Sequence, residues 1–227
     1  MNRVIEDSVT TLAASLDTAV RRIETAYEVR GMPIRVSSFD SPTVGSGGIV
    51  NEVQFQYNDF GQSILTSQAH SGAVIPGTTP SVRMGYADGA ANTIRPMSLT
   101  YPNGRVVTYD YGKSGGIQDS TSRVAGLIDG DLSATHLADY SYLGLGAVVQ
   151  QVSTQPGLRF TLVNPTGGND PVTGDIYSGL DLFGRVKDVR WRNATTGDDL
   201  SRMRWSRPGA NTNDRGKMIW CHRSGAD

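Results

Sequence analysis

Two glycine-containing stretches are the first candidates for a chemical site, because glycine lets a backbone approach a phosphate group closely. The GKS stretch at residues 112–114 matches the end of a phosphate-binding loop, but position 107, where that loop needs its first glycine, is a valine in an alternating segment. The GLG stretch at residues 144–146 lacks the third glycine of a dinucleotide-binding motif. Neither stretch predicts a nucleotide site, and we expect no cofactor.

The histidine and cysteine side chains, which can act as nucleophiles or metal ligands, are few and dispersed along the chain. They are His70, His136, Cys221 and His222. No histidine pair has the spacing that places two metal ligands on one face of an element. His136 lies near three aspartates, so a metal-binding or acid–base role is the alternative to a histidine in a surface loop. Cys221 and His222 are adjacent, and adjacent residues of a strand point to opposite faces. We therefore expect no enzyme.

A loop rich in glycine and oxygen donors covers residues 167–175 (GGNDPVTGD). Asn169, Asp170 and Asp175 are the weak metal candidates of the chain, because carboxylate and amide oxygens are ligands that Ca²⁺ prefers. The spacing does not match an EF-hand loop, and the same residue types are ordinary turn formers. The sequence thus favours a turn here and no metal site.

Four aromatic residues suggest a second possible function. Tyr140, Tyr142, Trp191 and Trp205 lie in alternating segments and would be able to stack on sugar rings if exposed. A carbohydrate- or cell-surface-binding β module, with glycans as partners, is therefore the alternative function. Aromatic residues that alternate along strands more often pack against their cross-strand neighbours.

The composition favours a turn-rich, all-β protein. The chain has 227 residues, of which 37% are hydrophobic, with 27 glycines and 10 prolines. The formal net charge of −1 and the scattered arginines predict no nucleic-acid partner. No apolar run is long enough to span a membrane. Glu6 and Asp7 interrupt the start of the chain, so we expect no signal peptide.

The hydrophobic period divides the chain into three parts. Apolar residues between Val9 and Ile23 have rough helical spacing. We expect residues 1–22 to form a linker or a short helix, residues 23–200 a β-hairpin repeat segment, and residues 201–227 a degenerate or truncated tail. From about residue 23 onward the period is two, which is typical of strands with one row of side chains on each face.

Turn signals recur between these strands. Tyrosine, polar residues and glycine follow one another at residues 27–31 and 57–61, with looser copies at 86–89, 109–112, 140–144 and 180–184. Five of the tyrosines, from Tyr27 to Tyr140, recur at intervals of 23 to 31 residues, which indicates a repeat architecture. Asn103 and Gly104 between two alternating runs predict a hairpin with a type I′ turn. The chain is thus expected to be an antiparallel β-hairpin ribbon or spiral.

These motifs resemble those of the YD-repeat (Rhs-type) family of large bacterial proteins. The resemblance rests on residues 57–62 (YNDFGQ), 101–105 (YPNGR), 109–111 (YDY), 140–144 (YSYLG) and 181–185 (DLFGR), and extends over residues 23–191. The residues expected to shape the repeat are Tyr27, Gly31, Tyr57, Gly61, Tyr101, Asn103, Gly104, Tyr109, Asp110, Tyr142, Asp181, Gly184 and Arg185.

The resemblance implies a function for the whole ribbon. Members of this family wind β-hairpins into a hollow shell that often encloses a toxic domain, and related repeats occur in cell-surface proteins. It therefore implies a secreted or cell-surface protein whose partners are other YD-type repeats, in the same protein or in neighbouring chains. The few repeats here imply a fragment of a larger shell. The tail is expected to be a decayed repeat or an out-of-frame end.

Overall fold

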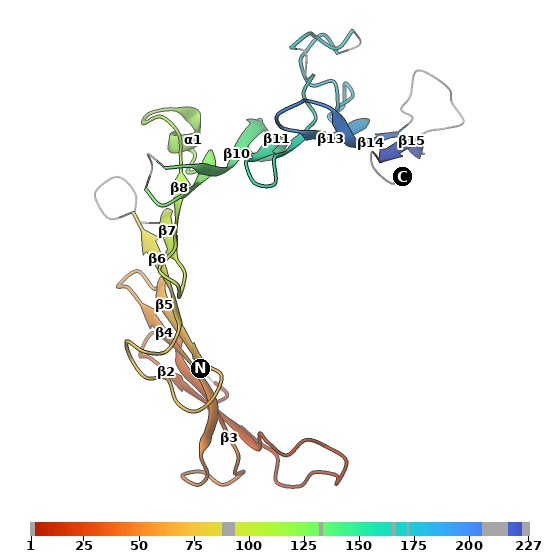
Figure 1. The fold of residues 1–227 in the computed structure, drawn as a ribbon. Helices are drawn as coiled ribbons and strands as arrows, with labels where there is room; N and C mark the ends of the chain where they lie inside the picture. The colour runs from red at the N-terminus through yellow and green to blue at the C-terminus, as the bar shows by residue number, and fades with distance from the viewer. Residues whose placement is uncertain are drawn as a thin grey trace. The chain divides into compact units, whose positions relative to one another are not determined.

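The computed structural model describes residues 3–87, 94–131, 134–164, 167–171 and 173–205, and the backbone of 218–223. These residues form fifteen strands and one short helix (Figure 1). The elements are β1 (Glu6–Ser8), β2 (Arg22–Tyr27), β3 (Pro33–Phe39), β4 (Ile49–Tyr57), β5 (Ser63–Ala69), β6 (Ser81–Tyr86), β7 (Pro96–Thr100), β8 (Val106–Asp110), α1 (Ile117–Ser120), β9 (Gly126–Asp129), β10 (His136–Leu143), β11 (Ala147–Ser153), β12 (Leu158–Thr161), β13 (Asp188–Asn193), β14 (Asp199–Trp205) and β15 (Met218–Arg223).

The chain divides into two units, Met1–Val107 and Thr108–Asp227. In the first unit each strand from β1 to β7 pairs antiparallel with the next one in the sequence. In the second unit the strands from β9 to β15 do the same. Antiparallel strands joined in chain order are successive hairpins. The predicted all-β hairpin ribbon is therefore confirmed.

The first residues are extended and form no helix. β1 pairs with β2, and Val9 donates its amide to the carbonyl of Arg21 at 2.9 Å. A helix over these residues would need a surface that covers its apolar stripe. In the structure Val9, Leu16 and Val20 are all exposed, so no such surface is present. The edge of β2 instead offers β1 a full set of backbone hydrogen bonds. Of the two expectations for this segment, the structure shows the extended one.

Four hairpins share the same five-residue turn. The turns cover residues 28–32, 58–62, 101–105 and 181–185. In each, the first amide donates to the fifth carbonyl and the fourth amide donates back to the first carbonyl, at 2.8–3.0 Å. The fourth residue is always a glycine with φ between 73° and 95°, a backbone conformation that side chains with a Cβ rarely adopt. The YD-like turn motif thus forms the same hydrogen-bonded turn, closed by a glycine with positive φ, at all four positions.

The turn at Tyr101 differs from the predicted type I′. Gly104 donates its amide to Tyr101, which makes Pro102 and Asn103 the central residues of the turn, and only Gly104 has a positive φ, of 82°. A type I′ turn centred on Asn103 would pair the amide of Pro102, which does not exist. The turn therefore begins one residue earlier and ends with a bulge at Gly104. The type I′ prediction was wrong because the proline fixes the register.

The looser copies of the motif do not share this turn. Tyr86 ends β6, but the last two residues of that copy, 88 and 89, lie outside the described residues. Asp110 ends β8 and accepts the amide of Gly112 at 2.8 Å, and the chain then enters a loop containing α1. β10 and β11 are joined at Gly144 by a tighter turn with a β-bulge beside it.

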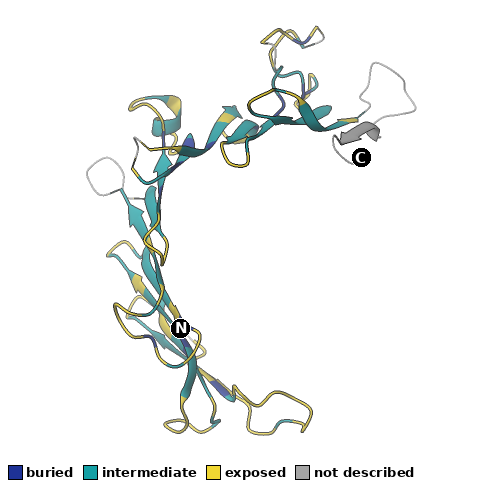
Figure 2. Cartoon of the chain, in the orientation of Figure 1, coloured by how far each residue is buried: buried dark blue, intermediate teal, exposed yellow. Residues whose placement is uncertain are grey.

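Buried side chains are few in both units (Figure 2). In the second unit Val149, Leu162 and Leu180 form an apolar cluster. In the first unit the buried residues include Arg22 and Glu52 as well as apolar side chains. Buried charges are tolerated only when they are fully hydrogen-bonded. The first unit therefore depends on polar networks where most domains depend on an apolar core.

Strand pairing continues into the segment expected to be a tail. β14 extends to Trp205, and β15 pairs with it antiparallel. The two sequence stretches that resemble a decayed repeat, residues 207–211 and 213–216, lie outside the described residues. The reading-frame hypothesis stays a prediction.

Candidate functional site

Tyrosines at strand ends connect each hairpin to the preceding strand. Their phenol groups donate to main-chain carbonyls of the neighbouring strand or of the residues just before it. The pairs are Tyr27 with Val4 (2.9 Å), Tyr57 with Pro33 (2.9 Å), Tyr86 with Ser63 (3.3 Å) and Tyr142 with Val124 (2.7 Å). The tyrosine of the repeat is therefore an inter-hairpin hydrogen-bond donor.

Neighbouring turns also pack directly on one another in the first unit. Arg30 of the first turn donates to the carbonyls of Asn58 and Asp59 in the second turn, at 2.9 and 3.0 Å. Side chains of the preceding segment lie against two of the turn glycines: a Cβ on Gly31 would meet the Arg3 side chain, and a Cβ on Gly61 would lie 3.4 Å from the Met32 side chain. Tyrosine, turn and glycine thus form one contact surface between consecutive hairpins.

Tyr57→Phe is expected to lower the free energy of unfolding by about 1 kcal/mol, because the Pro33 carbonyl loses its donor. Urea denaturation measures the change. Tyr109→Phe is the matched control, since the Tyr109 hydroxyl has no hydrogen-bond partner among the described residues. Equal denaturation midpoints for the two variants would contradict the proposed role of the tyrosine.

Arg22 organises the loop between β3 and β4. Its side chain is fully buried and stacks over the ring of Phe39, with the guanidinium carbon 4.1 Å from the ring centroid. It donates to the carbonyls of Ser41 and Thr43, both at 2.5 Å, and of Ser46 at 3.3 Å. One charged group therefore satisfies carbonyls that the loop would otherwise leave unpaired.

Glu52 plays the same role for the loop between β5 and β6. Its carboxylate accepts hydrogen bonds from Ser37 Oγ (2.7 Å), Gln54 Nε2 (2.7 Å) and the amide of Val74 (3.1 Å). Burial acts to raise the pKa of this carboxyl, but the three hydrogen bonds and the guanidinium of Arg35 outweigh it, so the pKa lies below the ordinary value of 4.5. The folded protein thus favours the charged form of Glu52.

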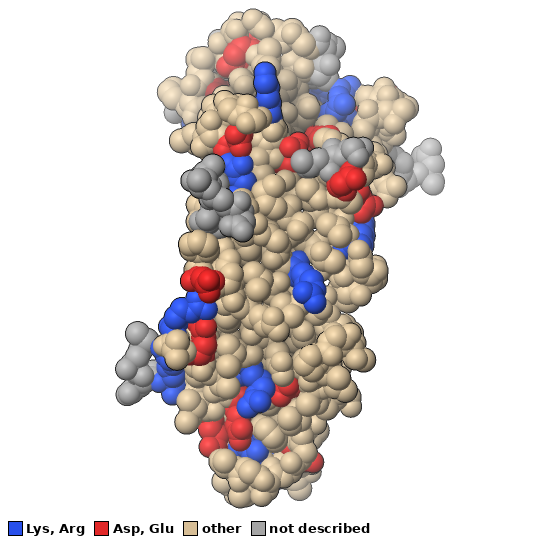
Figure 3. All heavy atoms as spheres, turned by 90° about the vertical axis from the view of Figure 1, so that its left-hand side faces the viewer, with Lys and Arg blue, Asp and Glu red and all other residues tan. Residues whose placement is uncertain are grey.

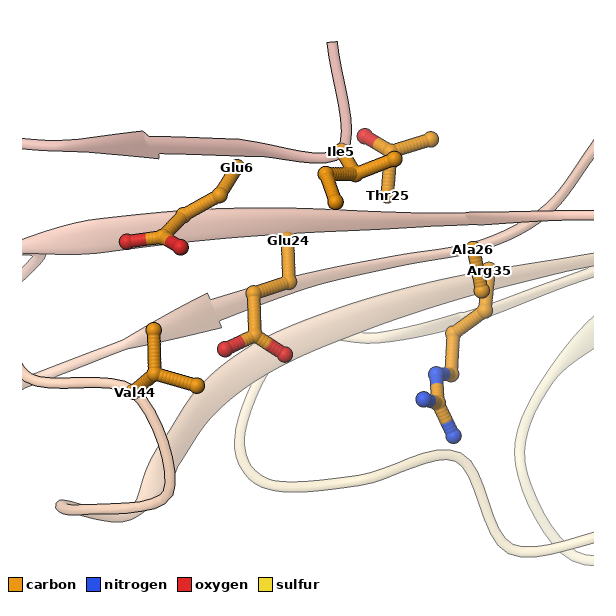
Figure 4. Close-up of a pocket in the computed structure, with 7 residues that line it drawn as sticks. All are labelled: Ile5, Glu6, Glu24, Thr25, Ala26, Arg35 and Val44. Carbon is orange, nitrogen blue, oxygen red and sulfur yellow. The ribbon is translucent and has the colours of Figure 1, made fainter. Parts of the chain in front are cut away.

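A pocket of about 270 Å³ lies beside Arg22 on the first strands (Figure 4). It is lined by Ile5, Glu6, Glu24, Thr25, Ala26, Arg35 and Val44. The two glutamates are cross-strand partners, and Glu24 is held by Arg22 at 2.7 Å. Among the described residues no group of three or more histidine, cysteine, aspartate or glutamate side chains is arranged to hold a metal ion. The polar groups of the pocket are two carboxylates, a guanidinium and the side chain of Thr25.

The first residue of the turn motif has its own structural role. Asp181 accepts the amides of Phe183 and Arg185 through one oxygen and the Arg185 guanidinium through the other, at 2.8–2.9 Å. Asn58 does the same for Phe60 and Gln62. Burial acts to raise the pKa of Asp181, but these hydrogen bonds hold it below 3.8. The aspartate of the motif therefore closes its own turn.

The candidate calcium loop is a hydrogen-bonded turn in the structure. Asp170 accepts the amide of Thr173 and pairs with Lys187 at 2.9 Å. Asp175 accepts the Thr173 hydroxyl and the Tyr177 amide, while Asn169 donates to the Gly174 carbonyl. Both side-chain oxygens of Asp170 and one of Asp175 are thus engaged within the protein.

The aromatic residues considered for sugar binding are half-buried. Tyr142 lies under the Arg123 guanidinium, at 4.1 Å from its ring centroid, and 6.4 Å from the ring of Tyr140. Trp191 packs on its cross-strand neighbour Phe160, with ring centroids 5.3 Å apart. Trp205 lies near the end of β14 and is also half-buried. Tyr101, at the start of its turn, is the exposed one among the tyrosines expected to shape the repeat.

The charged residues in view on one face of the molecule are interspersed, with uncharged surface between them (Figure 3). His136 pairs with Asp139 at 2.6 Å, and His70 is exposed. The side chains of Cys221 and His222 lie outside the described ones. In the described part of the chain, no helix has both the length and the hydropathy to cross a membrane.

The sequence did not single out Arg22 or Glu52, nor the arginines of β13 and β14. The burial of a single charged residue does not change the local sequence pattern, so Arg22 and Glu52 could not be recognised from the sequence. The arginines were visible as a period-two series at Arg190, Arg192, Arg202 and Arg204. The sequence did not reveal the pairing of β13 with β14, which brings these arginines to one face of the sheet.

No protein-family model matches the chain, and no curated protein does. Among solved structures, the Photorhabdus luminescens Tc holotoxin pore with a TccC3 mutation is similar, with a TM-score of 0.45 and 11% sequence identity. The match covers 91% of this chain and 10% of that chain. The chain thus spans about a tenth of the length of this structural neighbour.

Proposed function

We propose that this chain is a non-enzymatic YD-type repeat segment that forms part of the wall of a larger β assembly. The wall would enclose or present a toxin or a surface domain, as the sequence resemblance implies. The observation that carries the proposal is a repeated contact. The five-residue turn occurs at four positions and the tyrosine hydrogen bond at four strand ends, and the two occur together at Tyr27 and Tyr57. Hairpins that contact only their neighbours form a quasi-one-dimensional architecture.

The edge of the ribbon supports this role. Among the described residues β1 pairs with β2 alone. The Ile5 carbonyl accepts the amide of Thr25, so the antiparallel alternation directs the amides of Glu6 and Ser8 away from β2. An edge of this kind is a template for another strand. The partner we propose is a further strand of the same repeat type.

Sedimentation of the purified chain over a range of concentrations tests the proposal. We expect its mean mass to rise with concentration as open edges pair. Ser8→Pro removes one outward amide without touching the bonds to β2, and should reduce the association. Ser8→Ala, which keeps the amide, is the matched control and should associate like the wild type. A monomer at every concentration, unaffected by either change, would overturn the proposal.

A further inference from the structure

One face of β12, β13 and β14 carries more guanidinium groups than carboxylates. The pairing register places Arg159 opposite Arg192, Arg190 opposite Arg202, and Asp188 opposite Arg204. Asp199, opposite Arg192, completes the face. Side chains of directly paired residues lie on the same side of a sheet. Five arginines and two aspartates therefore share this face.

The two aspartates are already engaged by four of the arginines. Asp199 forms two hydrogen bonds with Arg190, at 2.7 and 2.9 Å, and Asp188 holds Arg202. Arg204 lies 3.8 Å from Asp188. Arg192 lies 3.3 Å from Asp199, but its Nε does not have hydrogen-bond geometry. The two carboxylates therefore do not neutralise the five guanidinium groups of this face.

Arg159 is the arginine outside this network. Its side chain has no hydrogen bond and no ion pair with any described residue, and its Nε is buried. It directly faces Arg192, whose Nε is likewise buried without an acceptor. Like charges placed directly opposite on a sheet are destabilising, and a buried donor without an acceptor adds to the cost. Arg192 has Asp199 nearby, whereas Arg159 has no carboxylate beside it among the described residues, so an acceptor that carries negative charge would stabilise Arg159.

We propose that Arg159 and Arg192 bind an oxyanion, either a phosphate group or a carboxylate, on this face of β12 and β13. Two adjacent guanidinium groups present planar sets of N–H donors that match the oxygens of both groups. One bound anion would supply acceptors to both arginines and offset part of the excess positive charge. This site is independent of the strand edge at β1.

The test is a titration followed through the arginine Nε–Hε signals in ¹H–¹⁵N spectra of the full chain. Inorganic phosphate and malonate are added separately at constant ionic strength. We expect saturable shifts of the Arg159 and Arg192 signals with at least one of the two anions. Saturation by phosphate alone identifies a phosphate site, and saturation by malonate alone identifies a carboxylate site.

Variants separate a site from general screening. Arg159→Gln should weaken binding about tenfold, the loss of one charge-assisted hydrogen bond. Arg83→Gln is the matched control, because Arg83 is an exposed strand arginine of the other unit, and it should leave binding unchanged. Arg159→Lys keeps the charge, so weaker binding by a normally folded Arg159→Lys chain attributes the affinity to the guanidinium. Shifts that never saturate, or that appear equally at Arg83, would overturn the proposal.

Discussion

Replacing Arg22 with methionine is expected to lower the free energy of unfolding by about 3 kcal/mol. Methionine retains the aliphatic packing on Phe39 but leaves the carbonyls of Ser41 and Thr43 without donors. The loop at residues 40–48 should then detach from the sheet. Urea denaturation measures the loss of stability, and digestion with a protease of broad specificity detects the exposed loop.

Arg83→Met is the control for the Arg22 variant. It makes the same chemical change on a strand of the same unit, at an exposed position. We expect it to change stability by less than about 0.5 kcal/mol. If both variants unfolded at the same urea concentration and resisted the protease equally, the role assigned to Arg22 would be wrong.

Glu52→Gln is the second change with a large expected effect, a loss of about 2 kcal/mol at neutral pH. The glutamine loses the charge that three donors and Arg35 stabilise. It also places an NH₂ group where the carboxylate accepts hydrogen bonds. The Val74 amide, and with it the loop between β5 and β6, should lose part of its anchoring.

The same carboxylate should make stability depend on pH. Its pKa in the folded state lies below the ordinary value of 4.5, so the unfolded state binds the proton first as the pH falls. The contribution of Glu52 is therefore complete above about pH 5 and decreases as the pH falls through 4.5 toward the folded-state pKa. The stability difference between wild type and Glu52→Gln should shrink over this range. Urea denaturation at several pH values measures it.

Glu6→Gln is the matched control for this pH effect. Glu6 is an exposed carboxylate on a neighbouring part of the same sheet. Its variant controls for the loss of one negative charge from the same sheet. A constant difference between wild type and Glu52→Gln from pH 7 to pH 3 would contradict the assignment, because the other carboxylates titrate in both proteins.

The sequence determined the fold class of this protein and the positions of its main turns. Alternation with a period of two specifies strands, and a glycine four positions after a tyrosine specifies where they reverse, because both signals are local. The all-β hairpin ribbon could therefore be predicted. The residues named as structural, such as Tyr57, Gly61 and Asp181, do lie at the ends of strands and in turns.

The tertiary structure decided what depends on partners distant in the sequence. Whether the first residues form a helix or a strand depends on the free edge of β2, which no local pattern reveals. The roles of Arg22 and Glu52 depend on loops folding back over the sheet, about 20 residues away along the chain. The excess of guanidinium groups around Arg159 depends on strand register, because a shift of one residue would send Arg159 to the opposite face. The period of alternation and the residue types of a turn depend on neighbouring residues, so the sequence shows them. Side-chain burial, strand register and charge balance depend on strands that are distant in the sequence, so only the tertiary structure decides them.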